Sequence, residues 1–93
     1  MKLSNLLTSI EYTVINDGNP EITDIIYDSR KVTDGTAFVC LKGYTSDGHK
    51  YAQSAVEKGA AALIISDDLS FDVPKNVAVI KVENTRKALA YIS

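Results

Sequence analysis

The sequence predicts a single small α/β domain, with a mixed, mainly parallel sheet of about five strands flanked by helices. Two observations carry this prediction: short continuous apolar runs at 37–41 and 60–65, and an apolar stripe at helical spacing between them. Strands buried on both faces give such runs, and a helix between them is typical of a right-handed crossover connection. The chain's 93 residues fit one domain.

The first third of the chain predicts a short helix and then a hairpin-like pair of strands. Leucine or isoleucine at positions 3, 6, 7 and 10 forms one apolar helical face. Segments 12–15 and 22–27 are rich in β-branched and aromatic residues, so both are expected to be strands. Asp17-Gly18-Asn19-Pro20 between them is a strong turn signal. Polar residues 28–36 predict a loop.

The middle of the chain predicts strand, loop, helix and strand. Strand 37–41 is followed by the polar loop 43–48, and strand 60–65 comes after the helix. The helix is expected to bury one face and to end at Gly59, a residue suited to the left-handed conformation that terminates helices. Its buried face comprises Tyr51, Ala52, Ala55 and Val56.

Beyond residue 66, an acidic surface loop at 67–76 precedes a strand at 77–82 and a last helix capped by Asn84. The buried residues of that helix are expected to be Ala88, Leu89 and Ile92. Its apolar pattern stops at Ser93 with no Gly, Pro or basic residue to end it. We therefore expect the chain to be a piece of a longer polypeptide.

Composition excludes several classes of function. The net charge is −2, and no basic run alternates with aromatic residues, so nucleic acid is not an expected partner. No apolar stretch approaches the roughly 20 residues that span a bilayer, and the first residues lack a signal peptide's apolar core. The single cysteine, Cys40, lies in an apolar run and is expected to be a small buried residue in a reducing, cytoplasmic compartment.

The loop from Gly43 to Gly48 has the G-x-x-x-x-G spacing of phosphate-binding loops. An ATP-hydrolysing loop needs Lys and then Ser or Thr after the second glycine, whereas His49 and Lys50 follow here. ATP hydrolysis at this loop is therefore not expected. Two alternatives remain: main-chain amides that hold a nucleotide or phosphate, or a tight turn in which Asp47 caps the next helix.

Asp28-Ser29-Arg30 follows the second predicted strand. A hydroxyl beside a guanidinium suits phosphate oxygens or the edge of a uracil ring, but Asp28 pairing locally with Arg30 or Lys31 would explain the same residues.

His49, the single histidine, is expected to cap or pack, although a hydrolytic Ser29–His49–Asp arrangement is conceivable. No metal site is expected. One Cys and one His cannot form a structural zinc site, and Asp67, Asp68 and Asp72 are typical of a solvated loop.

Four segments, in order, resemble the N-terminal domain of bacterial Mur ligases. They are Asp28-Ser29-Arg30-Lys31-Val32, Asp34-Gly35-Thr36-Ala37-Phe38-Val39, Leu41-Lys42-Gly43-Tyr44-x-x-Asp47-Gly48-His49-x-Tyr51, and Ala55-x-x-x-Gly59-Ala60-x-Ala62. The match runs from about Ile22 to Ile65 and more loosely to the end. It is closest to the ligases that form the UDP-N-acetylmuramoyl-tripeptide, and the pentapeptide-forming ligases share much of it.

The resemblance implies that residues 1–93 bind the UDP moiety of UDP-N-acetylmuramoyl-L-alanyl-D-glutamate. Tyr27, Ser29 and Arg30 in the first loop, and Tyr44, Thr45 and Ser46 in the second, would contact it; Gly43, Asp47, Gly48 and His49 would shape the second loop. Tyr27 stands where the family often has an aliphatic residue, and it could stack on uracil. No catalytic residue is expected among them.

The resemblance also implies a longer parent, with a central domain that binds ATP and Mg²⁺ and a C-terminal domain for the incoming amino acid. Those two domains and the nucleotide-linked substrate would be the partners of this chain. The 93 residues alone should be inactive because they contain no G-x-x-x-x-G-K-[ST] motif. The remaining alternatives are the same domain of a pentapeptide-forming ligase, or a non-catalytic interaction module.

Overall fold

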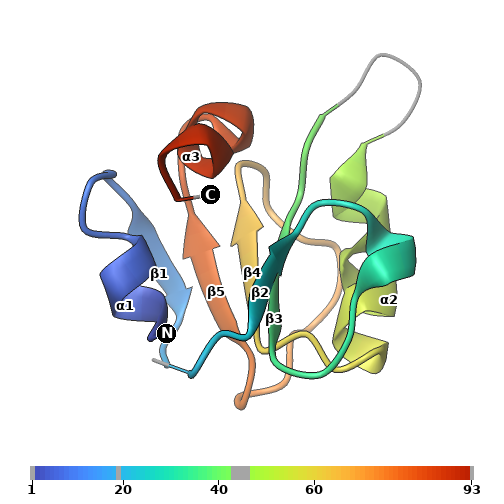
Figure 1. The fold of residues 1–93 in the computed structure, drawn as a ribbon. Helices are drawn as coiled ribbons and strands as arrows, with labels where there is room; N and C mark the ends of the chain where they lie inside the picture. Colours follow the sequence, from blue (N-terminus) through green and yellow to red (C-terminus); the bar gives the residue numbers. More distant parts are fainter. Residues whose placement is uncertain (1, 19, 43–46, 93) are drawn as a thin grey trace.

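The computed structural model describes residues 2–18, 20–42 and 47–92, which form one mixed five-stranded sheet between helices. The strands are β1 (Thr13–Asn16), β2 (Asp24–Ile26), β3 (Thr36–Val39), β4 (Ala62–Ile65) and β5 (Ala78–Lys81). The helices are α1 (Leu3–Leu6), α2 (Ala52–Glu57) and α3 (Thr85–Ile92), with single 3₁₀ turns η1 (Ser29–Lys31) and η2 (Gly48–Tyr51) (Figure 1). The predicted fold class is confirmed.

Strand order is β1-β5-β4-β3-β2, and only β1 runs antiparallel to its neighbour. β3 pairs in parallel with β4 through the α2 crossover, as the sequence predicts. β4 pairs in parallel with β5, although no helix lies in the connection between them among the described residues. The carboxyl ends of β2, β3, β4 and β5 therefore lie along one edge of the sheet.

The predicted hairpin-like pair is wrong. β1 pairs with β5 at one edge of the sheet, whereas β2 pairs with β3 at the other. Ile22 does not belong to a strand; it is buried against Leu3 and Leu7 of the N-terminal segment, and Leu3 N–H donates to the Pro20 carbonyl at 3.0 Å. The chain between β1 and β2 thus crosses the sheet and covers its apolar face.

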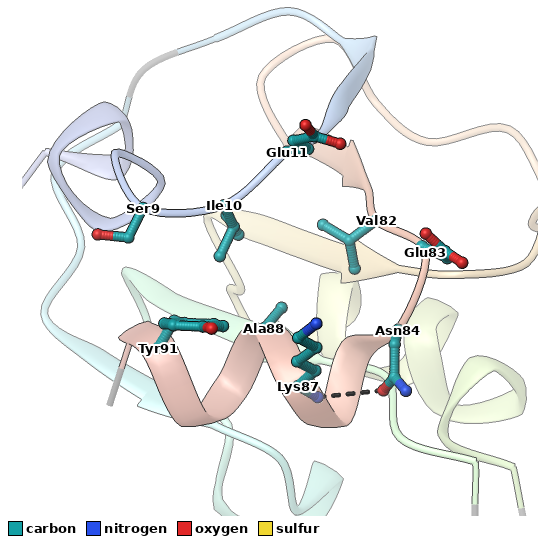
Figure 2. A pocket seen from close by; sticks show the side chains of 9 residues that line it. All are labelled: Ser9, Ile10, Glu11, Val82, Glu83, Asn84, Lys87, Ala88 and Tyr91. Atoms are coloured by element: carbon teal, nitrogen blue, oxygen red, sulfur yellow. Dashed lines mark hydrogen bonds between the residues drawn. The ribbon is translucent and has the colours of Figure 1, made fainter.

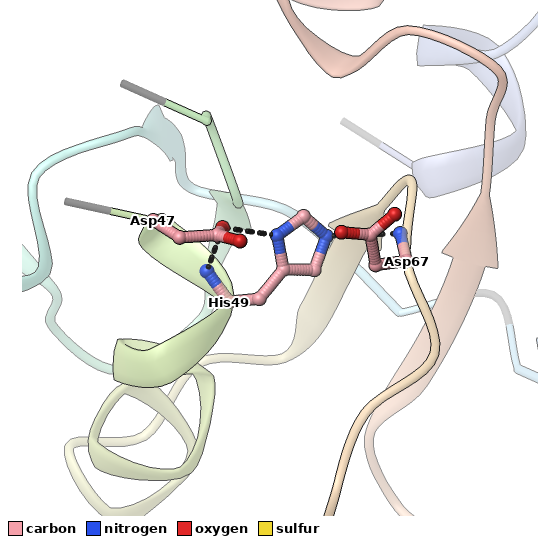
Figure 3. A group of neighbouring side chains, drawn as sticks. All are labelled: Asp47, His49 and Asp67. Carbon is pink, nitrogen blue, oxygen red and sulfur yellow. Dashed lines mark hydrogen bonds and ion pairs between the residues drawn. The ribbon is translucent and has the colours of Figure 1, made fainter. Parts of the chain in front are cut away.

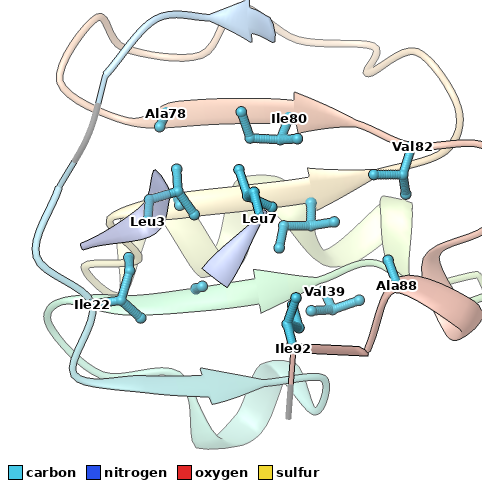
Figure 4. Close-up of a cluster of buried hydrophobic side chains, with 12 residues drawn as sticks. Leu3, Leu7, Ile22, Val39, Ala78, Ile80, Val82, Ala88 and Ile92 are labelled. Carbon is cyan, nitrogen blue, oxygen red and sulfur yellow. The ribbon is translucent and has the colours of Figure 1, made fainter. Parts of the chain in front are cut away.

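The central strands divide their side chains between two cores by simple alternation. Ala37 and Val39 of β3 face one core, and Phe38 and Cys40 face the other. Figure 4 shows the first core, which α1 and α3 cover. The second core is covered by α2 and by partly buried Leu69, Phe71 and Val73, so the acidic loop at 67–76 also packs on the sheet. No helix among the described residues is long and apolar enough to cross a membrane.

Gly59 ends α2, as the sequence predicts. Its φ of +102° is left-handed, and the amides of Gly59 and Ala60 donate to the carbonyls of Val56 and Ala55 at 3.1 and 3.0 Å. These two bonds satisfy the last carbonyls of the helix. The Gly59 carbonyl also accepts the Gly35 amide at 3.0 Å, which brings the end of α2 against the start of β3.

Replacing Gly59 with alanine is expected to lower the free energy of unfolding by more than about 1 kcal/mol. The alanine would have to adopt the left-handed backbone conformation of Gly59. Its Cβ would also collide with Asp34, whose Cα lies 3.0 Å from the Cβ position. Urea unfolding measures the loss. Glu57→Ala, on the exposed face of the same helix, is the control and should change stability by no more than about 0.5 kcal/mol. Equal stability of the two variants would contradict the proposed role of Gly59.

Candidate functional site: a pocket at the carboxyl edge of the sheet

A pocket of about 540 Å³ lies where the chain leaves β2 and β3. It brings together the predicted residues Tyr27, Ser29 and Arg30 and the predicted loop-shaping residue Gly48. The remaining described lining residues are Asp28, Phe38, Leu41, Tyr51 and Arg86. Two loops that are separate in the sequence therefore border one hollow, at the edge where α/β sheets place their ligands.

The first loop is a turn built by Asp28. Its Oδ1 accepts the Arg30 main-chain amide at 3.0 Å and Arg30 Nε at 3.1 Å, while Oδ2 accepts Arg30 Nη2 at 2.9 Å. The guanidinium and the main-chain amide of Arg30 lower the pKa of Asp28 to about 2. Local pairing of Asp28 with Arg30, one of the two alternatives for this motif, is thus present, and it occupies the Arg30 fork.

Lys58, just after α2, holds the same turn from the other side. Its Nζ donates to the main-chain carbonyl of Ser29 at 3.0 Å. This contact joins residues 29 positions apart, and it fixes the main chain of Ser29 at the pocket.

Main-chain contacts hold together the two stretches of chain that flank the 43–46 segment, residues 41–42 and 47–48, which we call the neck of this segment. Lys42 and Asp47 form an antiparallel bridge, and the Gly48 amide donates to the Leu41 carbonyl at 2.7 Å. A Cβ on Gly48 would lie 2.8 Å from the Leu41 main-chain nitrogen, so the approach of the two backbones requires glycine. Gly43, Tyr44, Thr45 and Ser46 lie outside the described residues, and their predicted contacts stay predictions.

His49 fastens this neck to the end of β4 (Figure 3). Its Nε2 accepts the main-chain amides of Ser66 and Asp67 at 3.0 and 3.1 Å, and Nδ1 lies 2.6 Å from Asp47 Oδ1. Because two amides donate to Nε2, the ring proton belongs on Nδ1, where it is donated to Asp47. Asp47 Oδ1 also accepts the His49 amide at 3.0 Å, so it caps η2, and these bonds lower the pKa of Asp47. Of the two predicted roles of His49, packing is confirmed, because the cap of η2 is the Asp47 side chain.

These contacts argue against the hydrolytic alternative for His49, and they bear on a possible metal site beside it. Both ring nitrogens are occupied, which leaves neither to activate Ser29. Asp47, His49 and Asp67 place potential metal-ligating atoms within 4.8 Å of one another, but Nε2 faces two N–H donors and the Asp67 carboxylate pairs with Lys42. The group is a hydrogen-bond and ion-pair network in which each of the three side chains already has a protein partner.

The comparisons with known proteins agree with this fold. The family described as "Mur ligase family, catalytic domain" matches residues 21–93. The chain belongs to the Mur ligase family. It is 46% identical over 94 residues to the UDP-N-acetylmuramoyl-L-alanyl-D-glutamate–2,6-diaminopimelate ligase of Clostridium botulinum, and 47% identical over 95 residues to that of Bacillus licheniformis. Each alignment covers the whole chain but only 20% and 19% of the relative, so the chain spans about a fifth of their length.

Solved Mur ligases share the fold. A crystal structure of MurF from Acinetobacter baumannii superposes with a TM-score of 0.80 at 28% identity, over 95% of this chain and 19% of that one. A MurF ligase from Thermotoga maritima, in complex with ADP, gives 0.64 at 28% identity over 74% of this chain and 15% of that one. The predicted family is therefore confirmed.

The structure adds two basic residues to the candidate site that sequence reasoning missed. Lys58 contacts the Ser29 carbonyl beside the pocket. Arg86 of α3 lines the pocket, and its Nη2 donates to the Lys42 carbonyl at 3.1 Å.

Cys40 is buried as predicted, and burial raises the pKa of its thiol to about 12, which makes it unreactive.

Another pocket, of about 370 Å³, lies beside α3 (Figure 2). Its walls come from residues 9–11, residues 82–84 and the face of α3 that carries Lys87, Ala88 and Tyr91. It contains none of the residues predicted from the sequence to bind substrate.

The Asp28 carboxyl is expected to titrate at about pH 2 in the folded chain. Its pKa is depressed, so the stability contributed by the pair with Arg30 is present above the ordinary carboxyl pKa and is lost as pH falls through about 2. Arg30→Gln should move the midpoint up toward the ordinary value, whereas Lys31→Gln should move it little because Lys31 is the weakest influence. Carboxyl ¹³C NMR measures the midpoint, and an unchanged value in Arg30→Gln would contradict the assignment.

Proposed function

We propose that this chain is the N-terminal substrate-binding domain of a tripeptide-forming Mur ligase and that its pocket holds the UDP moiety of UDP-N-acetylmuramoyl-L-alanyl-D-glutamate. The observation that carries the proposal is the meeting of the Tyr27–Arg30 turn and the neck of the 43–46 segment at one pocket. Tyr27 is 62% exposed, so its ring is available to stack on a uracil base.

The ligand's polar groups would be met by small donors. Ser29 would donate its hydroxyl, while Tyr44, Thr45 and Ser46 would offer hydroxyls and main-chain amides to the ribose or diphosphate. The bridge between Lys42 and Asp47 supports this proposal, because it brings the two residues that flank the 43–46 segment together beside the pocket.

The tripeptide-forming reaction is favoured over the pentapeptide-forming one by sequence identity. The relatives named as diaminopimelate-adding ligases are 44–47% identical to this chain, whereas the superposed MurF structures are 27–28% identical. A purely non-catalytic interaction module has no comparable support.

In the whole protein, we propose that a central domain binds ATP and Mg²⁺ and that a C-terminal domain binds the amino acid. The γ-phosphoryl group of ATP would pass to the substrate carboxylate, releasing ADP. The amino group of the incoming residue would then attack the acyl carbon and release phosphate, with loss of a proton. This chain would hold the nucleotide end of the substrate while that chemistry takes place in the cytoplasm. No catalytic group is assigned to residues 1–93.

Millimolar UDP added to the ¹⁵N-labelled chain is expected to shift amide resonances of residues 27–30 and 43–48. Ser29→Ala should weaken UDP binding about three- to tenfold through loss of one hydrogen bond. The same change at Ser9, in the pocket of Figure 2, is the control and should leave the affinity unchanged. No shifts, or shifts confined to residues around Ser9, would refute the proposed function.

A further inference from the structure

The candidate pocket contains two arginines in different electrostatic situations. The Arg30 guanidinium lies against Asp28 through Nε and Nη2, at 3.1 and 2.9 Å. The low pKa of Asp28, about 2, keeps this carboxylate ionised at neutral pH. The charges of the pair therefore nearly cancel, and Arg30 adds little net positive charge to the pocket.

Arg86 is the other arginine, and it has no such partner. It is an exposed residue of α3, and among the ion pairs of the described residues none includes it. Its contact with Lys42 is to a neutral main-chain carbonyl, which uses one of the five guanidinium N–H groups. Asp28, Arg30 and Arg86 are the charged residues among the described lining, so Arg86 supplies the pocket's net positive charge.

The contact with Lys42 also orients Arg86. It joins α3 to the neck of the 43–46 segment across 44 residues of sequence, at a donor–acceptor distance of 3.1 Å. A guanidinium anchored at one nitrogen loses less conformational freedom when its other nitrogens bind a ligand. Its planar fork matches the geometry of phosphate oxygens.

We propose that Arg86, rather than Arg30, is the arginine that binds the diphosphate of the nucleotide in this pocket. This inference rests on the proposed function, and it adds a residue outside the two predicted loops. In this arrangement, Tyr27 and Ser29 contact the nucleoside of the ligand, and Arg86 contacts its diphosphate beside Lys42.

The test compares UDP with uridine, which lacks the phosphates, by NMR titration of the 93-residue chain. Arg86→Gln should weaken UDP binding about tenfold or more, the effect of one charge-assisted hydrogen bond, and should change uridine binding less than about twofold. Arg86→Lys keeps the charge but loses the fork, and it should fall between wild type and Arg86→Gln. Lys87→Gln removes the same charge one residue away, outside this pocket, and should leave both affinities unchanged.

The outcomes separate the inference from the proposed function. If wild type binds UDP and Arg86→Gln binds it equally well, Arg86 is not the diphosphate ligand although the site stands. An equal loss of UDP and uridine binding would mean that Arg86 only braces Lys42, and this too would overturn the inference. If wild type binds neither compound, both proposals fall. Amide spectra establish that each variant is folded. If Arg86→Gln does not fold, the comparison of UDP with uridine is made on Arg86→Lys.

Discussion

The imidazole ring of His49 links the candidate site to the sheet. The His49 side chain is only 9% exposed, and its two nitrogens join Asp47 to the main chain just after β4. Loss of such a ring would leave two part-buried main-chain amides without their acceptor, and an unsatisfied donor away from water is costly. The role needs an acceptor on one side of the ring and a donor on the other, and neutral histidine provides both.

The other contacts at the site extend this fastening. Gly48 brings η2 within hydrogen-bond distance of Leu41, and Lys42 adds an ion pair with Asp67. Lys58 and Arg86, which follow α2 and begin α3, each donate to a main-chain carbonyl beside the pocket. The turn at Ser29 is thus held from α2, and the residues that flank the 43–46 segment are held from the end of β4 and from α3.

Local pattern predicted most of the sheet and helices correctly. Continuous apolar runs identified β3 and β4, Gly59 marked the end of α2, and Asn84 caps α3 by accepting the Lys87 amide at 3.1 Å. The pairing of β1 and β2 was mispredicted because a turn signal such as Asp17-Gly18 cannot tell a hairpin from a chain that crosses the sheet. That choice is made by distant residues, which bury Ile22 under the N-terminal segment.

The site was predictable only where its residues are close in sequence. Asp28 and Arg30 are two positions apart, and both alternatives for them could be read from the motif. Lys58 and Arg86 reach the site over 29 and 44 residues, and nothing in their own surroundings marks them. A signal did exist for the packing of the 67–76 loop, since Leu69, Phe71 and Val73 alternate as strand residues do, but its acidic residues obscured it.

The ring nitrogens of His49 provide the most direct test of the central claim, through a long-range ¹H–¹⁵N correlation spectrum of the folded chain at pH 7. The bonds to Asp47 and to the Ser66 and Asp67 amides predict one tautomer, with Nδ1 resonating as a protonated nitrogen and Nε2 as an unprotonated one. A ring that carries its proton on Nε2, or that averages between the two tautomers, would contradict the account.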